Sequence, residues 1–267
     1  MKAEEVSRRD VINLLDDITA RGSPVSANRT LALVSAVYRW ALAEDLLDTT
    51  PTLGIRPRII EVPRNRILDA DEIRQFWKGL EAAAMTESVK DILRLCLVTG
   101  QRVSEVAGAQ LIEMDLGNSI WDLPGARTKN KRPNRVPLSS MAIEIIERNL
   151  GESECLFPSP TSTGHIGPKA PMRALSRNRK HFDMEHFTAH DLRRSAASGM
   201  ASIGIDRTTI SAVLNHASAD RSVTGQVYDR YSYEAEKRNA LERWARRLTE
   251  IIEGKEPEKV VILRGGQ

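Results

Sequence analysis

The side chains best suited to chemistry in this sequence are basic clusters that fit the binding of a phosphate. The segment TAHDLRRSAAS places His190 three residues before Arg193, at the start of a predicted helix. A helix N-terminus carries partial positive charge and free N–H groups, so it favours a phosphate in two ways. The same spacing also occurs on ordinary surface helices, so a site here is a hypothesis that other segments must support.

A second cluster lies in ARTKNKRPNRVPLS, a predicted turn between two strands. The turn is either a solvated basic hairpin or a loop that contacts phosphates, with one lysine able to donate a proton. Its basic residues are Arg127, Lys129, Lys131, Arg132 and Arg135.

A third cluster precedes His190. Its spacing of three to four residues predicts that most of its members share one side of the chain, as a DNA-facing stripe requires. The residues on that side are Arg173, Arg177 and Lys180, with Arg179 beside them.

Two further segments add to this set. In TGQRVSEVAGAQ, Arg102 precedes Glu105 by three residues, which indicates neighbours on one helix face and is also typical of a surface ion pair. In LNHASADRSVTGQVYDRYSY, His216 follows an apolar helix end. Three of the four tyrosines of the chain come after it, namely Tyr228, Tyr231 and Tyr233. They either form a structural cluster or include a residue that takes part in chemistry.

The elements that must position these residues are mostly helical. The apolar spacing within residues 6–62 predicts one amphipathic helix, which follows a Ser-Pro-Val-Ser turn and ends near Leu47. Three prolines in TPTLGIRPRIIEVPRNR then indicate an extended linker and a domain boundary. We therefore divide the chain into a helical domain and linker (1–62), a second domain (63–252) and a tail (253–267) that we expect to be disordered.

The second domain is predicted to be mainly α with a small antiparallel β-sheet. Asp69 and Glu72 form a capping box at a helix start, and an apolar helix follows and stops at Gly100. A helix resumes at Arg102, and residues 111–139 then have strand character in LIEMDL, SIWDLP and RVPLS. Helices return from residue 140, and the last covers 234–252.

Composition excludes several classes of protein. The net charge is only +3, so a nucleic-acid partner must be argued from where the charge lies. The two cysteines have no metal-binding spacing, and Cys96 lies in an apolar run typical of a core. No stretch has the roughly 20 apolar residues that span a bilayer, so we expect a cytoplasmic protein with no membrane partner.

In chain order the segments read Arg, Lys, His-x-x-Arg, His, Tyr, and together they resemble the tyrosine recombinases, or phage integrases, of prophages and genomic islands. The resemblance covers about residues 6–252 and rests on TGQRVSEVAGAQ, TKNKRPNRVPLS, HDLRRSAAS and LNHASADRS…VYDRY. It implies a catalytic domain preceded by part of a helical core-binding domain. Family members usually carry an arm-site domain and a complete core-binding domain as well, so we expect this chain to bind DNA weakly.

The resemblance also implies a role for each residue. Arg102 and Arg193 would clamp the phosphoryl oxygens, so that neither a metal nor another cofactor is needed. Tyr228 would attack and form a 3′-phosphotyrosyl bond. Because a free tyrosine has a pKa of ~10, the attack needs a proton acceptor, for which His190 is the candidate.

Lys129 would protonate the departing 5′ oxygen, His216 would hydrogen-bond the phosphate, and Glu105 would orient Arg102 or His190. Lys131 competes with Lys129. Tyr231 competes with Tyr228, since 228 − 216 = 12 residues is longer than the usual interval in the family.

The implied partners are double-stranded attachment-site DNA and, on that DNA, three further copies in a tetramer that exchanges C-terminal segments. The helix at 234–252 is a candidate for the exchanged element, although we expect it to pack in cis in a DNA-free monomer. Two alternatives stay open: a type IB topoisomerase with the same residues, and an inactive DNA-binding prophage remnant.

Overall fold

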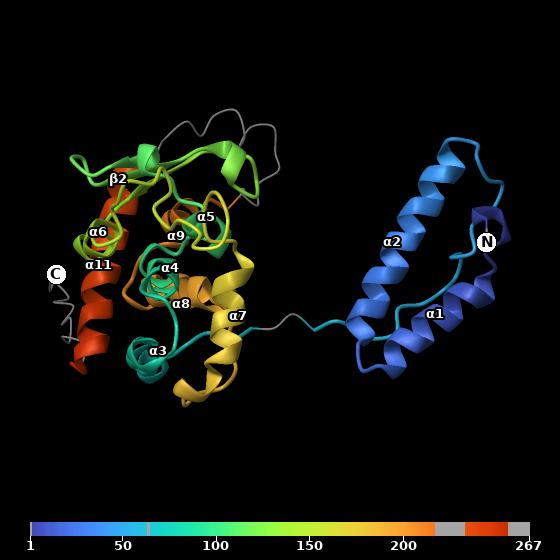
Figure 1. The fold of residues 1–267 in the computed structure, drawn as a ribbon, viewed down its shortest axis with the longest axis horizontal. Helices are drawn as coiled ribbons and strands as arrows, with labels where there is room; N and C mark the ends of the chain where they lie inside the picture. The colour runs from blue at the N-terminus through green and yellow to red at the C-terminus, as the bar shows by residue number, and fades with distance from the viewer. Residues whose placement is uncertain (1, 63–64, 217–232, 256–267) are drawn as a thin grey trace, which may run out of the picture. The chain divides into compact units, whose positions relative to one another are not determined.

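The computed structural model describes residues 2–62, 65–216 and 233–255. The chain divides into two compact units, Met1–Asn65 (unit 1) and Arg66–Gln267 (unit 2), shown in Figure 1. The division lies close to the predicted boundary after residue 62. Mostly helical structure with one small antiparallel sheet confirms the predicted fold class.

Unit 1 consists of a 3₁₀ turn, Ala3–Glu5, and two helices, α1 (Arg8–Ala20) and α2 (Pro24–Ala43). The predicted helix is α2, but the prediction was wrong in giving this region a single helix and in placing a turn at the Ser-Pro-Val-Ser segment. Pro24 is the first residue of α2, where its fixed φ suits a helix start and its missing N–H is not needed. The earlier helix α1 begins with a capping box between Ser7 and Asp10.

The helix α2 is apolar on two opposite sides. One side packs on α1 and buries Leu31 and Tyr38. The other side exposes Leu33, Val37 and Trp40, which recur at helical spacing. The sequence pattern of α2 alone therefore does not show which side faces the core of unit 1.

Unit 2 is built around α4 (Glu87–Thr99), which is buried along almost its whole length. It ends at Gly100, whose φ of 67° is a left-handed conformation that a residue without Cβ adopts freely. Around it lie α3 (Ala70–Ala82), which begins with the predicted capping box, α5 (Val103–Ala107) and α6 (Ser140–Glu147).

Within the described part of the chain, three strands form one antiparallel sheet in the order β1 (Met114–Asp115), β2 (Ile120–Leu123) and β3 (Asn134–Pro137). Trp121 pairs with Val136, so the apolar side chains of β2 and β3 share the core face. The first strand is shorter than predicted, because Leu111–Glu113 forms a 3₁₀ turn.

The remaining α-helices of the described residues are α7 (Lys169–Arg177), α8 (Ala189–Ser202), α9 (Arg207–Val213) and α11 (Glu234–Glu253), with a 3₁₀ turn at Arg179–His181. Figure 1 shows α8 beside α4 at the centre of unit 2, with α7 and α11 on opposite sides of them.

The helix α11 is part of the core of unit 2. Its Trp244 is 1% exposed and donates a hydrogen bond of 2.9 Å from Nε1 to the carbonyl oxygen of Leu97 on α4. The ring also lies against Gly199 on α8, where an added Cβ would come within 2.2 Å of it. The structure therefore packs this helix in cis.

Candidate phosphate-binding site

Arg193 lies at the centre of the predicted site. It is on the second turn of α8, and only 3% of it is exposed. Its guanidinium donates a hydrogen bond of 2.8 Å to the carbonyl oxygen of Gly100 and another to that of Leu214. Because Arg102 and His216 each follow one of these acceptors by two residues, Arg193 holds together the two segments that carry them.

Arg102 is held by Glu105. One carboxylate oxygen of Glu105 accepts from the Arg102 guanidinium at 2.8 Å, and the other accepts from its backbone N–H at 2.9 Å. Glu105 is 1% exposed, so this is a buried arrangement rather than the surface ion pair that the spacing also allowed. The helix α5 begins at Val103, and Arg102 is its N-cap rather than its first residue.

The charges of the site act on one another. Burial, and then the positive charge of Arg102, lowers the pKa of Arg193 to about 10, so Arg193 stays protonated at neutral pH. The pKa of His190 is lowered by partial burial and by the charges of Arg194, Arg193 and Arg102.

His216 is affected in the same way. Partial burial, then the charges of Arg193, Arg102 and His190, lower its pKa below 6.5, although its ring keeps contact with solvent. Four predicted residues thus lie within electrostatic reach of one another, and both imidazoles favour the neutral form at pH 7.

Buried amide side chains form hydrogen bonds to the segments that carry this cluster. Gln101 donates 2.9 Å to the carbonyl oxygen of Val213, and its Oε1 accepts from Asn134 on β3 at 3.2 Å. Lys237 on α11 donates to Asn134 Oδ1 at 3.2 Å and to the carbonyl oxygen of Arg135. The ends of α4 and α9, β3 and α11 are therefore connected by one hydrogen-bonded network.

The loop between β2 and β3 carries three exposed basic residues, Lys129, Lys131 and Arg132. Arg127, predicted to bind DNA, has a different environment. It donates 2.6 Å to Glu113 and 2.6 Å to the carbonyl oxygen of Glu105. We therefore revise its assignment: Arg127 supports the segment that carries Glu105.

Arg135 also has acidic neighbours, with its Nε 3.2 Å from Glu234 and 3.7 Å from Asp122. Arg173, Arg177, Arg179 and Lys180 are all exposed, but they do not form one helical stripe. The helix α7 ends at Arg177, and the chain turns into the 3₁₀ segment that holds the other two.

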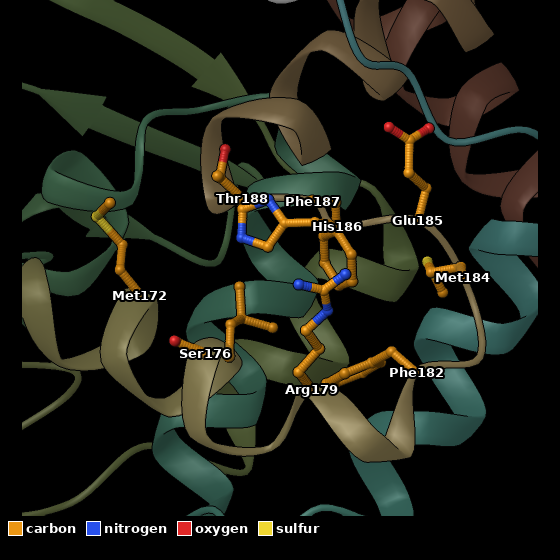
Figure 2. Close-up of a pocket in the computed structure, with 10 residues that line it drawn as sticks. Met172, Ser176, Arg179, Phe182, Met184, Glu185, His186, Phe187 and Thr188 are labelled. Carbon is orange, nitrogen blue, oxygen red and sulfur yellow. The ribbon is translucent and has the colours of Figure 1, made fainter. Parts of the chain in front are cut away.

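A pocket of about 150 Å³ lies between α7 and the N-terminus of α8. Figure 2 shows Met172, Phe182 and Met184 around it, with the guanidinium of Arg179 and the ring of His186 turned toward its centre. The side chain of Arg179 therefore lies at an apolar pocket, which is also lined by Thr188, the N-cap of α8.

Tyr228 and Tyr231 lie outside the described residues. Tyr233 is described and directly precedes α11. Within the described ranges there is no group of three or more His, Cys, Asp or Glu side chains arranged to hold a metal ion. In the same part of the chain, no helix has the length and apolar character needed to cross a membrane.

Sequence reasoning missed the amides Gln101, Asn130, Asn134 and Asn215, because a single amide has no distinctive spacing. Lys237 had a signal that could have been used. It lies four residues before Leu241 and seven before Trp244, on the apolar side of α11, where a lysine is unexpected unless it is bound.

Comparison with known proteins gives a consistent result. The sequence pattern of the phage integrase family matches residues 66–234. The prophage integrase IntA of Escherichia coli (strain K12) is 26% identical over 250 residues, which are 90% of this chain and 59% of that protein. The tyrosine recombinase XerD of Halalkalibacterium halodurans is 24% identical over 245 residues, which are 85% and 78% of the two chains.

Solved structures share the fold at lower identity. A lambda integrase (residues 75–356) dimer bound to a COC′ core site has a TM-score of 0.65 and 21% identity, over 80% of each chain. The Tn1549 transposon integrase in complex with circular intermediate DNA has a TM-score of 0.60 and 15% identity, over 88% of this chain and 86% of that one. This chain spans 59% and 44% of the length of the two prophage integrases IntA and IntZ of Escherichia coli.

Proposed function

This chain belongs to the phage integrase family, and on that premise we propose that it is a site-specific DNA recombinase that cuts and rejoins DNA through a 3′-phosphotyrosyl intermediate. The observation that carries the proposal is the position of Arg193. Its hydrogen bonds to Gly100 and Leu214 bring Arg102 and His216 to one place, beside His190. Two guanidiniums and two neutral imidazoles suit a phosphoryl group that gains negative charge as it is attacked.

Each residue has a proposed part in the reaction. Arg102 and Arg193 neutralise the phosphoryl oxygens, and Glu105 positions Arg102. The lowered pKa of His190 keeps its imidazole unprotonated at neutral pH, so that it accepts the proton of the attacking tyrosine. Tyr228 is our first candidate for the nucleophile and Tyr231 the second.

The remaining steps concern the leaving group and the product. As the phosphorus–oxygen bond breaks, a lysine of the exposed loop gives a proton to the 5′ oxygen. Lys129 is the first candidate and Lys131 the second. His216 donates a hydrogen bond to the phosphate. Since the phosphotyrosyl bond keeps the energy of the original phosphodiester, a 5′ hydroxyl reverses the step without another energy source.

The proposed partner is double-stranded DNA, bound by several copies of the chain, and the proposed location is the cytoplasm. The exposed residues Lys129, Lys131 and Arg132, with Arg173 and Arg177 on α7, are proposed to contact phosphates. Phosphate contacts release counterions, so we expect binding to weaken steeply with salt.

A DNA duplex nicked close to the cleavage site tests the proposal, because the short released strand diffuses away and traps the covalent intermediate. We expect an adduct that resists denaturant, that forms in EDTA, and that Tyr228→Phe abolishes while Tyr231→Phe does not. Loss of the adduct only in Tyr231→Phe would identify Tyr231 as the nucleophile instead of Tyr228.

The other outcomes favour the alternatives. DNA binding without any adduct would support an inactive DNA-binding protein and overturn the proposal. Adduct formation and relaxation of supercoiled plasmid without preference for sequence would support a topoisomerase.

A further inference from the structure

The turn that carries His216 has an asparagine at its left-handed position. His216 donates from its backbone N–H to the carbonyl oxygen of Ser211 at 3.0 Å, and Asn215 donates to that of Ala212 at 3.1 Å. This pair of bonds is the Schellman motif, which ends a helix with one left-handed residue. Asn215 is that residue, with φ of 47°. Glycine is the common choice there because it has no Cβ to strain, and asparagine is the next most common. Unlike glycine, asparagine has a side chain that can form further hydrogen bonds.

The Asn215 side chain is bound to the β2–β3 loop. Its Nδ2 donates 3.0 Å to the carbonyl oxygen of Arg132. Asn130 in turn donates from its Nδ2 to the backbone carbonyl oxygen of Asn215 at 2.7 Å and, more weakly, to its Oδ1 at 3.3 Å. We call these two residues, Asn130 and Asn215, the asparagine bridge.

The asparagine bridge fixes the part of the loop that holds the two lysines. Asn130 Oδ1 also accepts from the backbone N–H of Arg132 at 3.2 Å, and Lys131 between them has a φ of 59°. The chain thus makes a tight turn whose ends are both bound to Asn215. Lys129 and Lys131 flank Asn130 on either side and are exposed.

We infer that Asn130 and Asn215 are positioning residues that hold the loop lysine at a fixed place relative to His216 for transfer of a proton to the leaving oxygen. The inference rests on the proposed function and adds a specific role for two residues to it. Neither asparagine needs to touch the DNA. Their contribution is to limit the positions that a long, flexible lysine side chain samples, which makes proton donation efficient.

The variant Asn215→Gly separates this role from helix capping. Glycine adopts the left-handed conformation without strain, so the Schellman motif is retained while the side-chain bonds of Asn215 to Arg132 and Asn130 are removed. The bond from Asn130 to the backbone carbonyl oxygen of residue 215 is kept. Asn130→Ala removes the opposite half of the bridge. We expect both variants to fold, and hydrogen exchange to be faster at the loop amides 128–132 while exchange in α8 stays unchanged. Unchanged loop exchange in both variants would overturn the inference without any activity measurement.

The catalytic test compares two substrates that differ at one atom. In one nicked duplex the 5′ leaving atom is oxygen, and in the other it is sulfur, which leaves as a thiolate without receiving a proton because thiols are much more acidic than alcohols. Since general acid catalysis contributes about 10²–10⁴-fold, we expect Asn215→Gly and Asn130→Ala to slow adduct formation about 10–100-fold on the oxygen substrate. On the sulfur substrate we expect the native rate.

The outcomes distinguish this inference from the proposed function. Equal slowing on both substrates, or no slowing on either, would overturn the positioning role while the native chain still forms its adduct. If the native chain forms no adduct with either substrate, the proposed function itself fails and this inference fails with it.

Discussion

Arg193 on α8 donates a hydrogen bond of 2.8 Å to the carbonyl oxygen of Gly100, the residue that ends α4. The two residues are 93 positions apart in the sequence, and their bond joins the two central helices of unit 2 at the candidate site. A group proposed to bind phosphate is thus also a structural connection. Removing it is expected to affect both stability and chemistry.

Substitution of Arg193 separates these two effects. Arg193→Ala leaves the Gly100 and Leu214 carbonyl oxygens without their partner, which we expect to lower the free energy of unfolding by about 1–3 kcal/mol. Arg193→Lys restores a charge but not the forked geometry, so we expect partial recovery of stability and little recovery of adduct formation. Urea unfolding and the nicked-duplex reaction measure the two. As a control, Arg194→Ala at the next, more exposed position should cost less stability; an equal cost would contradict the structural role of Arg193.

The pH dependence of cleavage follows from the two histidines. Burial and neighbouring positive charge lower the pKa of both below 6.5, so the imidazoles are neutral at pH 7. We expect the rate of adduct formation to fall as the pH decreases below 6.5, because protonated His190 cannot accept the tyrosine proton. Unfolding should become easier over the same range, since the unfolded chain binds protons that the folded chain excludes. A rate that rises on acidification would contradict the proposed role of His190.

Lys237 gives a separate prediction about stability. Burial lowers its pKa from 10.5 to about 8, so between these two values the unfolded state binds more protons than the folded state. The contribution of Lys237 to stability therefore increases as the pH rises from about 8 to 10.5. In Lys237→Met this increase should disappear, and denaturant unfolding at pH 7.5, 9 and 10 measures it. Lys78→Met, on the exposed side of α3, should keep the native pH dependence.

Gly199 tests how closely α8 and α11 pack. A Cβ there would lie 2.2 Å from the Trp244 ring, so Gly199→Ala forces the helices apart and should cost about 1–3 kcal/mol of stability. Gly167→Ala is a matched control, because a Cβ at Gly167 meets no atom within 4 Å. Thermal or urea unfolding of both variants provides the comparison. Equal stability of the two would show that the contact is looser than described.

Local signals predicted much of the fold. The capping box at Asp69, the apolar run that ends at Gly100 and the strand character of residues 111–139 all depend on neighbouring residues, and the structure contains each of these elements, with the first strand shortened. The helix α1 was missed because only two of its residues, Val11 and Leu15, are buried, which leaves a weak periodic signal. The helix α2 was predicted because its apolar residues recur at helical spacing along most of its length.

The candidate site was likewise predicted only in part from the sequence. Motifs identified Arg102, His190, Arg193 and His216, which the structure places within electrostatic reach of one another. Motifs did not distinguish Arg127, bound to Glu113, from the exposed basic residues of the same loop. That difference depends on how the loop folds back onto a distant segment, and a sequence pattern does not contain this information.

The burial of α11 limits how copies of this chain can be linked. Leu241, Leu248 and Ile251 are each at most 5% exposed, and each buried side chain of this kind contributes roughly 1.5–3 kcal/mol. A protomer that gave this helix to a neighbour without receiving an equivalent helix in return would lose that contribution and expose the Gly199 face of α8. If copies of this chain are linked in the proposed assembly, either the linking segment lies outside Glu234–Glu253 or the exchange of α11 is reciprocal, because only these two arrangements leave each subunit with a complete core.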